Sequence, residues 1–121
     1  MDAKTSGFAS PAQGYEEEAI DLNRLLIHNP PATYFVRLDS SDMTTLGLPR
    51  GSILIVDRSK DPIPNQHVMI RHQGEFLCRL LAEHNGLTVF TNGVNDISPI
   101  VDETEIIGVI TASIQIYDFP H

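Results

Sequence analysis

Basic side chains are scarce in this sequence of 121 residues. Eight Lys and Arg stand against 16 Asp and Glu, so the formal net charge is −8 at neutral pH. Direct binding to nucleic acid relies on clustered Lys and Arg that neutralise backbone phosphates. The composition therefore argues against a free-standing nucleic-acid binder, and a connection to DNA would have to run through a partner.

The sequence also has a single cysteine and no residue spacing that is typical of a metal site. The single cysteine, Cys78, excludes an internal disulfide, and its apolar surroundings predict a buried small side chain. The five histidines fall on expected loops and strand ends, with no pair at helical spacing: His28, His67, His72, His84 and His121. We therefore expect no zinc site and no cofactor.

Long apolar runs and glycine-rich motifs are absent as well. No run approaches the roughly 18 residues that a membrane-spanning helix needs, and the sequence does not open with a secretory signal pattern. Neither a phosphate-binding glycine loop nor a serine between glycines occurs, and Gly51 is expected to adopt a positive φ in a turn. These absences predict a cytoplasmic protein.

Short runs of β-branched, aliphatic and aromatic residues make up much of the chain. The expected strands are residues 34–36, 53–56, 67–71, 75–81, 87–91 and 106–117. The pairs Gln73-Gly74 and Asn85-Gly86 between them are typical of tight turns. Short strands at close spacing predict a mainly β fold with a barrel-like or strongly twisted sheet.

The N-terminal part has a different character. Residues 1–14 are rich in Ser, Ala, Gly and Pro and are expected to form a flexible arm, followed by one domain at residues 15–121. Residues 15–27 place three glutamates before apolar residues. This pattern is typical of a short helix or turn that stops before Pro30.

Residues 32–57 predict two buried strands joined by a polar turn. The turn carries the sequence Asp-Ser-Ser-Asp at residues 39–42, directly before Met43. Polar clusters beside a rigid strand often carry function. On composition alone, however, this cluster is an ordinary polar turn.

Four segments resemble the UmuD and LexA-like S24 peptidase family: residues 20–27, 32–37, 51–57 and 74–76. The resemblance runs from about Ser6 to the last strand and is closest to the UmuD type, which lacks the DNA-binding domain of LexA-type repressors. It implies a mainly β, LexA/UmuD-type twisted sheet, or partial barrel, with an extended N-terminal arm. It also implies an accessory subunit of an error-prone translesion DNA polymerase in the SOS response to DNA damage.

The same resemblance locates the Ser-Lys dyad with which the family cleaves itself. The family serine stands directly before a methionine, a place held here by Asp42 before Met43. The family lysine stands four residues after the glutamate that begins a strand, a place held here by Arg79 after Glu75. Both catalytic positions are therefore expected to be substituted.

These substitutions would remove the chemistry of the dyad. A serine attacks when a base takes its proton, and a buried lysine can be that base because desolvation lowers its pKa. Arg79 stays protonated at ordinary pH, and Asp42 would remain ionised beside it. We expect Asp42 and Arg79 to form a charge-assisted pair, whose disruption would cost about 3–5 kcal/mol if the pair is well buried.

Two routes would retain a peptidase. Ser41, or its neighbour Ser40, could replace the serine after a shift of one residue, although such a shift turns a side chain to the opposite face of a strand. Lys60 could supply a base, although the sequence places it in a loop after the second strand. The sequence favours a pseudo-peptidase over these displaced dyads.

Ser6 and Gly7 resemble the remnant of the family's cleavage site in the N-terminal arm. Only six residues precede Gly7, fewer than precede the cut in the family. This start predicts a chain made close to its processed form. A shortened piece of a longer protein would begin in the same way, and the sequence leaves both interpretations open.

These residues and the resemblance predict a non-catalytic subunit like UmuD', the processed form of UmuD. The resemblance implies a homodimer, a Y-family polymerase of the UmuC type as partner, and contact with a recombinase filament. The negative charge fits contact with DNA through partners only. Two alternatives stay open: a self-cleaving peptidase with a displaced dyad acting at Ser6-Gly7, and a regulatory partner that forms mixed dimers with an active relative.

Overall fold

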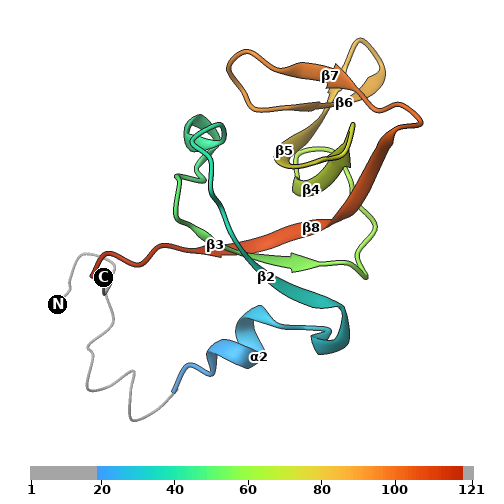
Figure 1. Cartoon of the computed structure of the whole chain (residues 1–121). Coiled ribbons are helices and arrows are strands. Elements are labelled where there is room, and N and C mark those ends of the chain that lie inside the picture. Colours follow the sequence, from blue (N-terminus) through green and yellow to red (C-terminus); the bar gives the residue numbers. More distant parts are fainter. Residues whose placement is uncertain (1–18, 119–121) are drawn as a thin grey trace, which may run out of the picture.

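The computed structural model describes residues 19–118, and most of these lie in or between β-strands (Figure 1). Within this range the α-helix is α2 (Leu22–Leu26), and two 3-10 turns cover Pro30–Ala32 and Thr44–Leu46. The strands are β2 (Thr33–Arg37), β3 (Ile53–Asp57), β4 (His67–His72), β5 (Glu75–His84), β6 (Leu87–Thr91), β7 (Ile97–Pro99) and β8 (Thr104–Ile114). The predicted mainly β fold is confirmed. The flexible arm expected at residues 1–14 lies outside the described residues.

The seven strands in the described part of the chain form one antiparallel sheet in the order β2-β3-β8-β4-β5-β6-β7. The long strand β8 joins the two halves of this sheet, as Figure 1 shows. Its C-terminal half, Val109–Ile114, pairs with β3, and its N-terminal half, Thr104–Val109, pairs with β4. One strand shared in this way lets the sheet bend, which agrees with the strongly twisted sheet predicted from the sequence.

Two tight turns and one glycine adopt the conformations that the sequence predicted. Gln73 and Gly74 connect β4 to β5 with φ of 52° and 81°, and Asn85 and Gly86 connect β5 to β6 with φ of 53° and 80°. Two consecutive positive φ values match the twist of a two-residue hairpin. Gly51, with φ of 91°, turns the chain into β3.

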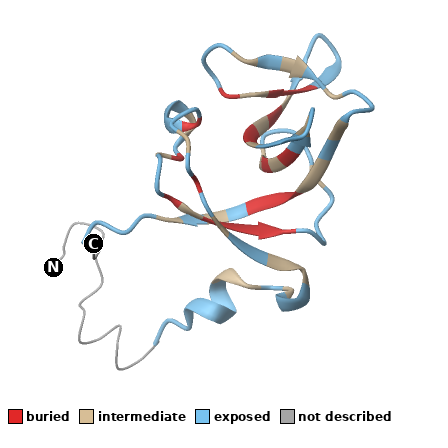
Figure 2. Cartoon of the chain, in the orientation of Figure 1, coloured by how far each residue is buried: buried red, intermediate tan, exposed pale blue. Residues whose placement is uncertain are grey.

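Buried side chains form two clusters, which Figure 2 shows mainly on the central strands. The larger cluster joins the β2–β3 loop to β3, β5 and β8 and consists of Leu38, Met43, Leu48, Leu54, Val56, Cys78 and Ile110. The smaller one joins β4, β5 and β6 and consists of Val68, Ile70, Leu81 and Phe90. Cys78 is 7% exposed, which confirms its predicted burial.

The prediction of two buried strands in the central stretch is correct for β3 and wrong for β2. Tyr34 and Phe35 are 47% and 59% exposed, whereas Leu54, Ile55 and Val56 are almost fully buried. The physical reason is position, because among residues 19–118 β2 is the last strand at its end of the sheet and pairs only with β3. Apolar content alone does not distinguish an edge strand from a central one.

Other boundaries also differ from the sequence-based expectation. The helix has five residues and begins after Asp21, whose carboxylate accepts a hydrogen bond from the Arg24 backbone N–H. The glutamates expected in its first turn fall outside the described residues. Strand β7 was not predicted because it has three residues and ends in Pro99, and β8 ends at Ile114 rather than Tyr117. Within residues 19–118, no helix has the length and apolar character needed to cross a bilayer.

Candidate functional site

The polar turn singled out in the sequence lies in the long loop between β2 and β3. Its anchor is Met43, which is fully buried and whose backbone carbonyl accepts hydrogen bonds from the N–H groups of Leu46 and Leu48. Next to this anchor, the backbone N–H of Asp42 donates to the hydroxyl oxygen of Ser40 at 3.0 Å. Burial of Met43 therefore places Asp42 at the surface of the larger core cluster, facing β5.

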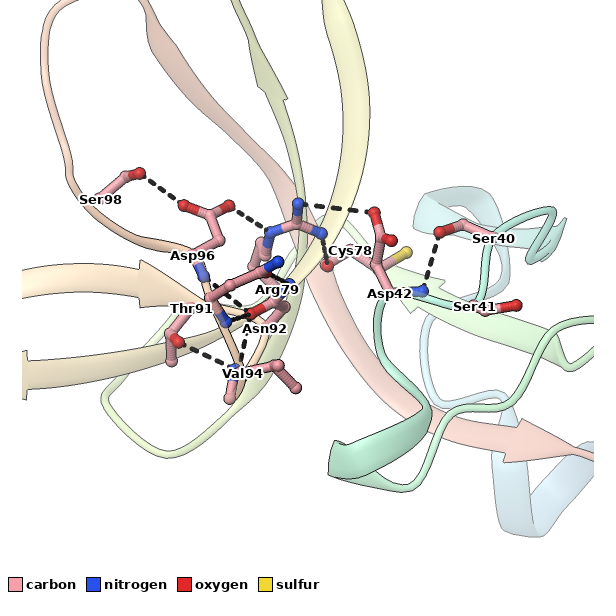
Figure 3. Close-up of polar contacts among 12 residues, drawn as sticks. Ser40, Ser41, Asp42, Cys78, Arg79, Thr91, Asn92, Val94, Asp96 and Ser98 are labelled. Carbon is pink, nitrogen blue, oxygen red and sulfur yellow. Dashed lines mark hydrogen bonds and ion pairs between the residues drawn. The ribbon is translucent and has the colours of Figure 1, made fainter.

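Arg79 lies on β5 with its side chain only 8% exposed. Its Nε donates to Asp96 Oδ2 at 2.9 Å, and one terminal nitrogen, Nη1, donates to the carbonyl of Cys78 at 2.8 Å. The other terminal nitrogen, Nη2, lies 3.8 Å from Asp42 Oδ2. The guanidinium thus bridges two loops, one carrying Asp42 and one carrying Asp96 (Figure 3).

Hydrogen bonds fix the place of Asp96 in the loop between β6 and β7. The buried side chain of Asn92 organises this loop, because its Oδ1 accepts hydrogen bonds from the backbone N–H groups of Val94, Asn95 and Asp96. The second carboxylate oxygen of Asp96 accepts a hydrogen bond from the Ser98 hydroxyl at 2.7 Å. Both oxygens of the carboxylate therefore have defined partners.

The pKa of Asp96 reflects a competition between burial and these partners. Burial by itself raises the pKa. The hydrogen bonds from Ser98 and Arg79, together with the positive charges of Arg79 and His72, outweigh burial and hold the pKa of Asp96 below its ordinary value. The ion pair between Arg79 and Asp96 is therefore charged at neutral pH.

A cavity of about 210 Å³ opens beside Arg79, on the side of Asp42. Its polar lining includes Asp39, Ser40, Asp42 and Arg79, and its apolar lining comes from β2, β4, β5 and Met43. Cys78 also lines the cavity, but burial raises the pKa of its thiol to about 11. The thiol is therefore protonated at neutral pH and is a poor nucleophile.

The structure brings together some of the residues that the sequence singled out and separates others. Asp42 and Arg79 form an ion pair at 3.8 Å, as expected. The pair is not well buried, because the Asp42 side chain is 56% exposed. Ser40 lines the cavity. Ser41 is exposed and its hydroxyl points away from Arg79 (Figure 3). Lys60 is exposed beyond the C-terminal end of β3, whereas the Asp42 loop enters the N-terminal end of that strand.

The cleavage-site remnant expected at Ser6 and Gly7 lies outside the described residues. Among residues 19–118, no three His, Cys, Asp or Glu side chains are grouped so that they could hold a metal ion. The closer acidic partner of Arg79, the partly exposed Asp96, was missed from the sequence. Asp96 stands 17 residues from Arg79, and no local pattern connects the two positions before the β6–β7 loop is folded.

The sequence model of the family described as Peptidase S24-like matches residues 1–111. The chain belongs to the S24-like peptidase family. It is 35% identical to protein SamA of Salmonella typhimurium LT2 over 111 residues, which are 90% of this chain and 78% of SamA. It is 35% identical to protein MucA of Escherichia coli over 114 residues, 91% of this chain and 78% of MucA. Protein ImpA of Escherichia coli is 38% identical over 80 residues, 66% of this chain and 55% of ImpA.

Membership of the S24-like family confirms the resemblance to UmuD and LexA-like proteins on which the sequence interpretation rests. Family membership makes Asp42 and Arg79 candidates for the functional site, because the resemblance aligns them with the family's serine and lysine. In this member the two side chains carry opposite charges and lie 3.8 Å apart.

Loss of the Asp42 carboxylate is expected to change stability little. An exposed ion pair contributes about 0–1 kcal/mol, and Asp42 is more than half exposed, so Asp42→Ala should lower the free energy of unfolding by less than about 1 kcal/mol. Urea denaturation of the two proteins measures this difference. A loss of several kcal/mol would show that Asp42, rather than Asp96, is the main partner of Arg79.

Acid is expected to weaken the fold through Asp96. A carboxylate whose pKa is lower in the folded state stabilises that state above the unfolded pKa of about 3.9, and this contribution disappears as the pH falls through the folded pKa. Asp96 is such a group. Between about pH 5 and pH 2, the free energy of unfolding should therefore fall more steeply in the unsubstituted chain than in Asp96→Asn. Asp57, whose pKa is also lowered, contributes equally to both proteins, so equal slopes would contradict the assignment.

Proposed function

We propose that this chain is a non-catalytic accessory subunit of the UmuD' type, which serves an error-prone translesion DNA polymerase in the SOS response to DNA damage. The observation that carries the proposal is the side chain at position 79 and its contacts. Its side chain is a buried guanidinium, bonded to Asp96 at 2.9 Å and facing a carboxylate at position 42. The proposal is that a site of this kind serves structure and binding rather than peptide cleavage.

The physical chemistry of the two positions supports a loss of cleavage. A hydroxyl at position 42 would be the nucleophile of a Ser-Lys dyad, and a neutral amine at position 79 would be its base. Arginine cannot act as that base because it is not deprotonated in proteins. A carboxylate such as that of Asp42 accepts hydrogen bonds and has no hydroxyl to take the place of the serine nucleophile.

The surface supports a role through protein partners. Tyr34 and Phe35 are exposed on β2, the last strand at its end of the sheet within residues 19–118. Exposed apolar groups on an edge strand are suited to contacts with another protein. The net charge of −8 opposes direct binding to DNA. We propose a homodimer that binds a Y-family polymerase of the UmuC type and contacts the recombinase filament.

Co-purification with a UmuC-type polymerase, followed by primer extension across a DNA lesion, tests this role. The full chain should be retained by the polymerase and should increase synthesis past the lesion. It should do so without cleavage, and Asp42→Ala should behave in the same way. Retention by an active S24 relative in place of the polymerase would contradict the proposal and favour the mixed-dimer alternative.

A further inference from the structure

Asp96 accepts its hydrogen bond from Nε of Arg79 rather than from a terminal nitrogen of the guanidinium. The hydrogen bond uses Nε, which is bonded directly to the guanidinium carbon. A lysine at position 79 has its ammonium nitrogen at the place in the side chain where arginine has that carbon. In the same rotamer, such an ammonium would therefore lie one bond from the atom that now contacts Asp96.

The carboxylate would not move away to make room. Asp96 is fixed through its backbone N–H to Asn92 Oδ1 at 3.0 Å and through its other carboxylate oxygen to Ser98 at 2.7 Å. Neither bond depends on which cation stands at position 79. The β6–β7 loop, rather than the side chain at position 79, therefore determines where the Asp96 carboxylate lies.

We propose that Asp96 is a positioning residue that orients the guanidinium of Arg79 and would keep a lysine at position 79 in its protonated form. It is then a second barrier to catalysis, in addition to the substitutions at positions 42 and 79. Restoring serine and lysine there, as Asp42→Ser with Arg79→Lys, leaves the site inactive until Asp96 is neutralised. The inference rests on the proposed loss of cleavage and names a further residue that maintains it.

The charges around position 79 support this assignment. Asp96 faces it from the β6–β7 loop, Asp42 from the β2–β3 loop, and the protonated thiol of Cys78 adjoins it on β5, while His72 on β4 acts on Asp96 through its charge. Once Asp42 is replaced by serine, Asp96 is the carboxylate that remains in contact with position 79, because Asp39, which also lines the cavity, is 95% exposed and pairs with Arg50. An opposite charge this close raises the pKa of an amine by about 1–3 units, which opposes the lowering by burial that a lysine base needs.

The test compares the full chain carrying Asp42→Ser and Arg79→Lys with the same chain carrying Asp96→Asn in addition. The sequence contains two other lysines, Lys4 and Lys60, so NMR of labelled lysine can follow the introduced amine directly. Adding Asp96→Asn should lower its pKa by at least about one unit, which is a tenfold change in the protonation equilibrium. Labelling of the introduced serine by a fluorophosphonate probe at pH 8 should accelerate by about the same factor.

Glu105→Gln provides the matched control. Glu105 also pairs with an arginine, Arg71 at 2.6 Å, but both side chains are about half exposed and belong to β8 and β4. Adding Glu105→Gln to the double variant should leave the titration and the labelling unchanged. Equal titration of the introduced lysine with and without Asp96→Asn would overturn the proposal.

A second measurement covers the case in which Asp96→Asn does not fold. In the double variant, which keeps Asp96, the pKa of the carboxylate should be lower than in the chain carrying Asp42→Ser and Arg79→Met, because lysine supplies a positive charge beside Asp96 and methionine does not. Equal Asp96 pKa values in these two chains would overturn the proposal. Failure of the proposed function has a different signature, namely cleavage or absence of polymerase binding in the unsubstituted chain.

Discussion

Replacing Arg79 by methionine is expected to lower the free energy of unfolding by about 3 kcal/mol, measured by urea denaturation. Removal of one partner from a buried ion pair costs about 3–5 kcal/mol, because the other charge is left without compensation. The lower end applies here because Asp96 keeps 27% of its side chain exposed. Methionine retains much of the volume of the arginine stem, so the effect reports the charge rather than a cavity.

Arg71→Met is the control for this change. Arg71 also pairs with a carboxylate, that of Glu105, but its side chain is 53% exposed. Exposed pairs contribute about 0–1 kcal/mol, so this variant should lose less than about 1 kcal/mol. Equal losses of unfolding free energy in the two variants would show that the ion pair of Arg79 does not link the β2–β3 loop to the β6–β7 loop.

The second large effect is expected at Met43, which is fully buried in the larger core cluster. Met43→Ala should lower the free energy of unfolding by about 2–5 kcal/mol, since truncation of a buried side chain loses its transfer free energy and leaves a cavity. Urea denaturation measures the loss. Because the same residue anchors the loop that carries Asp42, the NMR signals of residues 39–48 should also shift.

Thr45→Ala provides the comparison for Met43. Thr45 lies two residues further along the same loop and is exposed, so its truncation should change stability by less than about 0.5 kcal/mol. A loss at Met43 as small as that at Thr45 would mean that the loop is not anchored by this side chain.

Much of the sheet follows from local sequence. The pairs Gln73-Gly74 and Asn85-Gly86 specify tight hairpins because both positions need a positive φ, and they fix the register of β4 with β5 and of β5 with β6. Burial of Cys78 also followed from its apolar neighbours. These are short-range properties, which a sequence expresses directly.

The parts that could not be predicted depend on contacts between distant segments. The exposure of Tyr34 and Phe35 follows from the place of β2 at the end of the sheet that residues 19–118 form, and the residues of a strand do not determine its place in the sheet. Asp96 meets Arg79 because Asn92 folds the β6–β7 loop, and a carboxylate after Asn-Gly-Val-Asn reads as an ordinary turn residue. The sequence therefore located Asp42 and Arg79 but not the partner that dominates the electrostatics of Arg79.

The most direct test of the central claim is the intact mass of the purified full chain, before and after prolonged incubation at alkaline pH with an activated recombinase filament. A self-cleaving member of the family, incubated in parallel, verifies that the filament is active. We expect the mass to stay unchanged, because a guanidinium at position 79 cannot take a proton from a nucleophile. Loss of the mass of residues 1–6 would show that a nucleophile and a base still meet in this fold, and would contradict the assignment of Asp42 and Arg79 as a site that has lost its dyad.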